Sequence, residues 1–212
     1  MGAKTWMLVY ADTDVREALA GATLDREATR RLVAKLFPRK ELAPIKDGSL
    51  AWTSPPDKEI YAGCFPGVSV VAAAEFGIDY PSKLSPAFLQ ATGKKVYLHA
   101  MHSVVDWFAY ASWADGELVR ALSVSPEHGI MEDIGKPLPF EEAFWAGQRP
   151  AVDEDEDEEG YPLPFHPLDM GEAALAALFG YQLEGLHDPS LLNPESVPLM
   201  RFRSVKPFWK FW

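Results

Sequence analysis

The sequence has a single cysteine, Cys64, in 212 residues. One cysteine excludes an intramolecular disulfide framework and zinc sites built from clustered cysteines. No apolar run approaches the ~18 residues that a membrane-spanning helix needs. The apolar run from Trp6 to Ala11 is too short for the core of a signal peptide and is closed by Asp12. These features predict a soluble cytoplasmic protein that does not contact a membrane.

Positive charge is also scarce. The chain has 20 Lys+Arg against 31 Asp+Glu, which gives a net charge of −11. A nucleic-acid partner is not expected, because binding to phosphates needs a positive surface. The sequence contains no glycine-rich phosphate loop, no Gly-x-Ser-x-Gly and no His-Glu-x-x-His. P-loop hydrolysis, Rossmann redox chemistry and α/β-hydrolase chemistry are therefore disfavoured, and no cofactor is expected.

The apolar content of 48% is sufficient for one sizeable core. Apolar runs and turn residues predict strands over 4–11, 60–64, 68–76, 96–101, 107–114 and 117–124. Capping residues and apolar stripes predict helices over 14–19, 25–37, 85–92, 140–145 and 169–183. The expected fold is α+β: a single domain over 1–199 with a mostly antiparallel or mixed sheet of about six to seven strands. The sheet is expected to be built from β-α-β-β-like units, with helices packed on it.

The strongest local prediction is a hairpin centred on Asp115-Gly116. Asp-Gly between two apolar runs is typical of a type I′ turn. A regular hairpin with this turn pairs Trp113 with Leu118 and Ala111 with Arg120. Both faces of the hairpin are largely apolar, which predicts a central position covered on both sides.

Five stretches of the chain carry a resemblance. They are MGAKTWMLVYAD, YAGCFPGVSVV, LHAMHSVVDWFAYASWADGELVRALSVSP, GIMEDIGKPLPFEEAFWAG and YPLPFHPLDMGEAALAALFGYQLEG. On these stretches the chain resembles a family of uncharacterised actinobacterial proteins. The resemblance implies no activity, cofactor or catalytic residue, because none is assigned to that family. It does not extend over the tail from Met200.

His99, His102 and Asp106 are the first candidates for chemistry. On a helix the three side chains would share one side and could bind a metal ion. On a strand His99 and His102 would point to opposite faces of the sheet. The surrounding valines and aromatic residues favour the strand, and therefore two structural histidines.

Asp12 and Asp14 are the second candidates, because they directly follow the first expected strand. Acidic residues at a strand end can bind a metal ion. Helix capping explains one of them equally well and is the favoured interpretation.

Two charged segments remain. The run Asp153–Glu159 has seven consecutive carboxylates, so a disordered acidic loop is expected over 151–160. The tail 200–212 combines four basic residues with five aromatic ones, among them Trp209, Phe211 and Trp212. Clustered aromatic side chains rarely stay exposed, so the tail is expected to dock on its own domain or on a second copy.

Two functions remain open. The favoured one is a non-catalytic interaction or regulatory protein whose partner is an unidentified protein or a second copy of the chain. The alternative is a small metal-dependent hydrolase that uses His99, His102 and Asp106, or Asp12 and Asp14.

Overall fold

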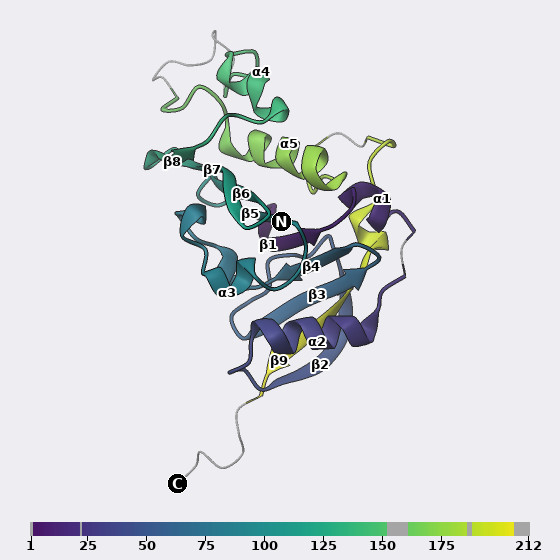
Figure 1. Ribbon diagram of the computed structural model, residues 1–212. Coiled ribbons are helices and arrows are strands. Elements are labelled where there is room, and N and C mark those ends of the chain that lie inside the picture. The colour runs from purple at the N-terminus through teal and green to yellow at the C-terminus, as the bar shows by residue number, and fades with distance from the viewer. Residues whose placement is uncertain (1, 22, 152–160, 186–187, 206–212) are drawn as a thin grey trace.

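In the computed structural model, nine strands form one open sheet in the order β2-β9-β3-β4-β1-β5-β6-β7-β8 (Figure 1). The structure describes residues 2–21, 23–151, 161–185 and 188–205. Every neighbouring pair of strands is antiparallel. The bounds are β1 Lys4–Ala11, β2 Leu42–Ser49, β3 Glu59–Phe65, β4 Val68–Ala72, β5 Lys95–His102, β6 Trp107–Ala114, β7 Glu117–Ser125, β8 Gly129–Ile134 and β9 Pro198–Ser204.

The expectation of six to seven strands in β-α-β-β-like units is therefore wrong. The strands β2 and β8 were missed because they are the two edges of the sheet, where neither composition nor alternation needs to be apolar. Pro44 in β2 removes a hydrogen-bond donor, and an edge strand tolerates that loss. β9 contains residues 200–204 of the expected tail and lies between β2 and β3, with Phe202 buried.

The helices are few and short. They are α1 Val15–Leu19, α2 Arg26–Leu36, α3 Pro86–Leu89, α4 Glu142–Trp145 and α5 Pro167–Phe179, with 3-10 turns η1 Ala74–Phe76, η2 Pro81–Lys83, η3 Pro139–Glu141 and η4 Pro194–Ser196. Asp14 and Asp25 cap α1 and α2 by accepting backbone N–H groups. α5 was expected to continue to residue 183, but it ends at Gly180, whose φ of 78° suits a glycine after a helix.

Helices cover both faces of the sheet, and each face has its own core. Side chains alternate along β1, so Met7 and Val9 face α1 and α5, whereas Leu8 and Tyr10 face α2 and α3. The ribbon shows α5 and α2 on different sides of the strands (Figure 1). The central strands are consequently buried on both faces, as expected for the hairpin of β6 and β7.

The turn of that hairpin is confirmed. Asp115 and Gly116 have φ values of 50° and 85°, the positive values that a type I′ turn needs. Trp113 pairs with Leu118 as predicted.

The predicted register fails one residue further on. The register shifts between Ser112 and Trp113, so that Arg120 pairs with Ser112 instead of Ala111. The extra residue of this bulge is Val119, which is 47% exposed. The shift turns Arg120 toward the face that α5 covers, where its side chain is fully buried.

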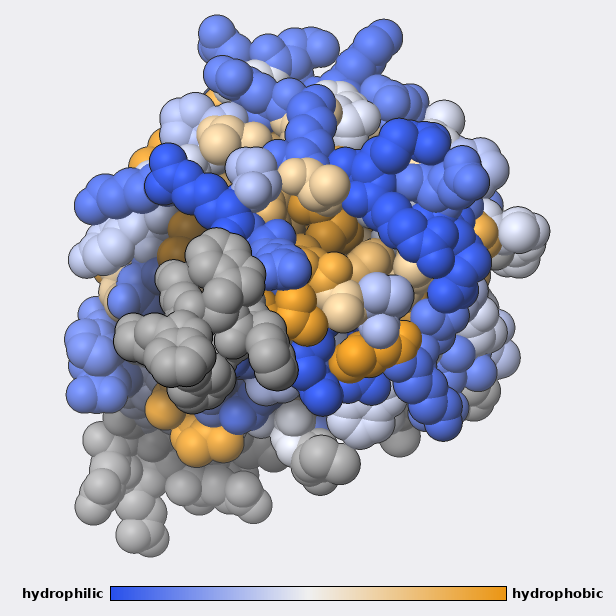
Figure 2. Space-filling model, turned by 90° about the horizontal axis from the view of Figure 1, so that it is seen from below, coloured by the Kyte–Doolittle hydropathy of each residue, from blue (hydrophilic) through white to orange (hydrophobic). Residues whose placement is uncertain are grey.

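The surface is mainly polar. Figure 2, which views the molecule from below, shows hydrophilic side chains around smaller separate hydrophobic areas. In the described part of the chain, no helix is both long enough and apolar enough to cross a bilayer.

Candidate functional site

His99 lies in the core between β5 and α5. Its Nε2 atom lies 3.0 Å from the carbonyl oxygen of Gly171, and its Nδ1 atom lies 2.6 Å from the hydroxyl of Thr5. Nε2 must donate to the carbonyl, so Nδ1 accepts from the hydroxyl. Burial lowers the pKa of His99 to about 4, so the ring is neutral at pH 7. These contacts join helix α5 to the sheet.

His102 lies on the opposite face of the sheet, as the strand interpretation predicted. Its ring packs against Trp6 at a tilt, with 5.6 Å between ring centroids, and its Nδ1 accepts the N–H of Val104 at 3.1 Å. Partial burial lowers the pKa of His102, and the charge of Lys4 lowers it further. Asp106 belongs to a different contact, with its Oδ2 atom 3.8 Å from Nε2 of His166. The structure therefore does not bring His99, His102 and Asp106 together.

Asp12 and Asp14 each accept a backbone N–H group. Asp12 Oδ1 lies 3.0 Å from the amide nitrogen of Lys94, and Asp14 Oδ1 lies 3.0 Å from that of Glu17. Within the described ranges, no group of three histidine, cysteine or acidic side chains is placed to hold a metal ion. The remaining candidates, Trp209, Phe211 and Trp212, lie outside the described residues, as does the whole acidic run Asp153–Glu159.

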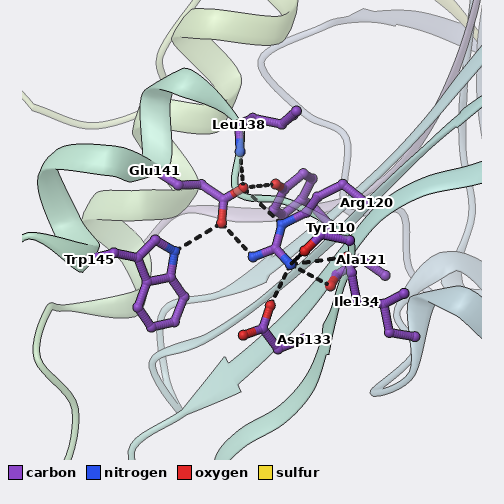
Figure 3. A network of polar contacts seen from close by, with 9 residues as sticks. Tyr110, Arg120, Ala121, Asp133, Ile134, Leu138, Glu141 and Trp145 are labelled. Carbon is purple, nitrogen blue, oxygen red and sulfur yellow. Dashed lines mark hydrogen bonds and ion pairs between the residues drawn. The ribbon is translucent and has the colours of Figure 1, made fainter.

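A network of polar contacts surrounds Glu141, and its residue types also occur in active sites (Figure 3). Its carboxylate accepts hydrogen bonds from the side chains of Arg120, Tyr110 and Trp145 and from the backbone of Leu138. We call these side chains the Glu141 clamp. Arg120 Nε and Nη2 lie 3.0 and 2.6 Å from the two carboxylate oxygens, and both side chains are fully buried.

The chemistry of the Glu141 clamp is that of a structural ion pair. Burial alone would raise the pKa of Glu141, but hydrogen bonds from Arg120 and Tyr110 outweigh it and leave that pKa below its ordinary value. Burial and the neighbouring carboxylate raise the pKa of Tyr110. The carboxylate is thus held ionised with both oxygens occupied, so it offers no free general base.

The candidate functional site is a groove of about 660 Å³ on the other face. We call it the Trp6 groove. It is lined by Trp6, Gly77, Asp79, Tyr80, His102, Val105, Trp107, Ser125, Glu127, His128, Ile130 and Met131. These residues come from β1, the loop after η1, the β5–β6 turn, and the β7–β8 region.

Aromatic rings form the base of the Trp6 groove. The ring centroids of Trp6 and Trp107 are 6.2 Å apart, and His102 continues the row beyond Trp6. Gly77 lets the loop after η1 approach closely, because a Cβ atom there would lie 2.9 Å from the Trp6 ring. Tyr80 and Val105 stand exposed at the rim.

The charges of the Trp6 groove are of one sign. Asp79 and Glu127 are exposed carboxylates, and no lysine or arginine is among the described lining residues. Two cations approach from outside: Lys83 lies over the Tyr80 ring at 4.2 Å, and Lys4 is close enough to His102 to lower its pKa. Sequence reasoning found only His102 of this site, because the other residues come from segments that no motif connects.

The fold and this groove define a protein with one open antiparallel sheet, helices on both faces, and an acidic aromatic groove. A family model matches residues 5–202, which is nearly the whole chain. The chain therefore belongs to a family of unknown function (DUF6928). Comparisons with curated proteins and with solved structures found no match.

Proposed function

We propose that the chain is a non-catalytic binding protein that takes a lysine- or arginine-bearing segment of a partner protein into the Trp6 groove. The observation that carries this proposal is the pairing of aromatic rings with carboxylates in a groove that has no lysine or arginine among its described lining residues. Aromatic faces and carboxylates are the two groups that attract ammonium and guanidinium ions.

The contact between Lys83 and the Tyr80 ring shows the same chemistry within the chain. A single exposed cation–π contact is worth about 0.5–1 kcal/mol, and an exposed ion pair about 0.2–1 kcal/mol. Several such contacts give a reversible association, and the net charge of −11 speeds the approach of a basic partner.

The proposal disfavours anionic partners. A phosphate backbone or an anionic lipid surface would be repelled by Asp79 and Glu127 and by the acidic surface as a whole. The buried single thiol of Cys64 suits a reducing compartment, and this supports the cytoplasm as the place of action. The alternative of a metal-dependent hydrolase gains no support, because its five residues serve separate structural contacts.

The test measures the affinity of a fluorescent lysine- and arginine-rich peptide and of a matched glutamate-rich peptide. We expect the cationic peptide alone to bind, with an affinity that falls as salt rises. Asp79→Asn and Glu127→Gln should each weaken it about two- to fivefold. Glu117→Gln, an exposed acid outside the Trp6 groove, is the matched control.

The aromatic part is tested with two tryptophans. Trp6→Ala should lower the affinity for the cationic peptide further. Trp52→Ala, at a 53% exposed tryptophan outside the groove, should leave the affinity unchanged. Circular dichroism of both variants separates a loss of binding from a loss of folding. Equal affinity for both peptides, or equal effects of the two tryptophan substitutions, would overturn the proposal.

A further inference from the structure

A second concavity, of about 420 Å³, lies on the face of the sheet that carries α5. We call it the Lys95 cleft. Its floor is formed by β5, β6 and β7 with Tyr97 and Val119, and its walls are Leu138 and Phe140 on one side and Leu178 of α5 on the other. It is separate from the Trp6 groove, with which it shares no lining residue.

The lining of the Lys95 cleft is almost entirely apolar. Apart from the hydroxyl groups of Tyr97 and Ser112 and the side chain of Lys95, its lining side chains are aliphatic or aromatic. Small-molecule sites are typically concavities of about 300–1,000 Å³ with apolar walls and a few polar groups. The size and the lining of this cleft therefore suit a small ligand with a long apolar part.

Lys95 determines which polar end such a ligand would have. It is the one charged residue among the described lining residues, and it is exposed. Lys95 and Tyr97 are two residues apart on β5, so both side chains are on the face of the cleft. Lys95 forms no ion pair with any residue that the structure describes. Its ammonium group is thus available beside the apolar lining of the Lys95 cleft.

We propose that the Lys95 cleft binds an aliphatic carboxylate, with the alkyl chain between α5 and η3 and the carboxylate at the ammonium group of Lys95. The exposed ammonium group of Lys95 is the one charge among the described lining residues, so the ligand carboxylate is placed there. This inference goes beyond the proposed function and is independent of it.

The first test is a chain-length series of hexanoate, octanoate, decanoate and dodecanoate, titrated below their micelle concentrations by isothermal calorimetry. Each added methylene should strengthen binding about three- to fourfold until the cleft is full. Decanol should bind about two- to fivefold more weakly than decanoate, which is the range that an exposed ion pair supplies.

Variants then place the ligand. Lys95→Ala should remove the preference for decanoate over decanol, and Lys94→Ala, at the adjacent exposed lysine outside the cleft, is the matched control. Ala177→Trp adds a large side chain at an exposed lining position of α5 and should abolish binding of both ligands. Unchanged melting temperatures would show that these variants are folded.

Three results with the wild type and Ala177→Trp, and one with the lysine variants, would overturn the proposal. The first three are no binding of any carboxylate in the series, equal affinity for decanoate and decanol in the wild type, and binding that survives Ala177→Trp in a folded variant. Equal losses in Lys95→Ala and Lys94→Ala would also contradict it, because the contact would then be general attraction to surface charge.

Discussion

Glu141 of η3 and Glu59 of β3 are two buried glutamates, and arginine binds both. The partner of Glu141 is Arg120, whose side chain is fully buried. The partners of Glu59 are Arg201 and Arg203 of β9, whose side chains are 30% and 59% exposed. The same pair of residue types therefore forms a closed contact in the core in one place and an open contact across two strands in the other.

The difference between the two contacts shows how access to solvent sets the contribution of an ion pair to folding stability. For both glutamates burial raises the pKa, and hydrogen bonds from arginine outweigh it, so both pKa values lie below the ordinary one. Water can replace the partners of Glu59 when they are lost, because its arginines reach the surface. Water cannot replace Arg120 inside the Glu141 clamp, so the loss of Arg120 leaves an uncompensated buried carboxylate. The loss of Glu141 leaves the buried Arg120 paired with Asp133, which is partly exposed.

The largest effect is therefore expected for Glu141→Gln. It leaves the buried Arg120 with the partly exposed Asp133 as its one acidic partner among the described residues, and should lower the free energy of unfolding by about 3–5 kcal/mol. Urea denaturation at pH 7 measures it, with Glu142→Gln as the exposed neighbouring control. A loss below about 1 kcal/mol would show that the clamp is no stronger than a surface pair.

His99 is the opposite case to Glu141, because it is a buried titratable group that stays neutral whereas Glu141 stays charged. Its folded pKa of about 4 lies below the unfolded value of about 6.5, so its contribution is complete above pH 6.5 and is lost as the pH falls toward 4. The loss should reach about 3 kcal/mol. Unfolding curves of wild type and His99→Gln over this range check it: the variant should lack that slope.

A substitution at Gly135 tests the backbone that contacts Arg120 of the Glu141 clamp. It has a φ of 84°, and its carbonyl lies 3.4 Å from Nη1 of Arg120. A Cβ atom at Gly135 would lie 2.1 Å from the carbonyl oxygen of Val119, whereas one at Gly116, with nearly the same φ, would meet open space. Gly135→Ala should thus cost at least about 2 kcal/mol and Gly116→Ala about 1 kcal/mol. Equal melting temperatures would contradict this reading.

Glu59→Gln should have the smallest effect, about 1 kcal/mol. The hydrogen bonds from Arg203 at 2.7 Å and Arg201 at 3.1 Å would weaken, but both arginines remain solvated. Measurement beside Glu141→Gln in the same denaturant gives the ratio directly. A cost equal to that of Glu141→Gln would end the distinction between the closed and the open contact.

Much of the central sheet could be predicted from the sequence, because its signals are local. Asp115-Gly116 defines a turn by backbone conformation alone, and the apolar residues around His99 and His102 identify a strand whose alternation separates the two rings. The alternation could not reveal the bulge at Val119, since one extra residue leaves each half of the strand with a normal pattern.

The edge strands of the sheet and the Trp6 groove could not be predicted from the sequence, and the reason differs from that for the bulge. β2 contains Pro44 and Lys46 because an edge strand needs no second partner, and this makes it resemble a loop. Trp6, Tyr80 and His128 are each ordinary in their own segments and become a site only when the sheet order places them together. The sequence contains no local signal of that order.

The position of β9 has a consequence for biosynthesis. β9 separates β2 from β3, so neither of these strands has its full set of neighbours until residue 204 has left the ribosome. Until then the backbone hydrogen-bonding groups of β3 that face β9 have no partner, although β3 is buried along its whole length in the finished fold. An exposed apolar edge of this kind invites pairing with other nascent chains. β9, which follows the other described strands in the chain, is thus the strand that ends this risk.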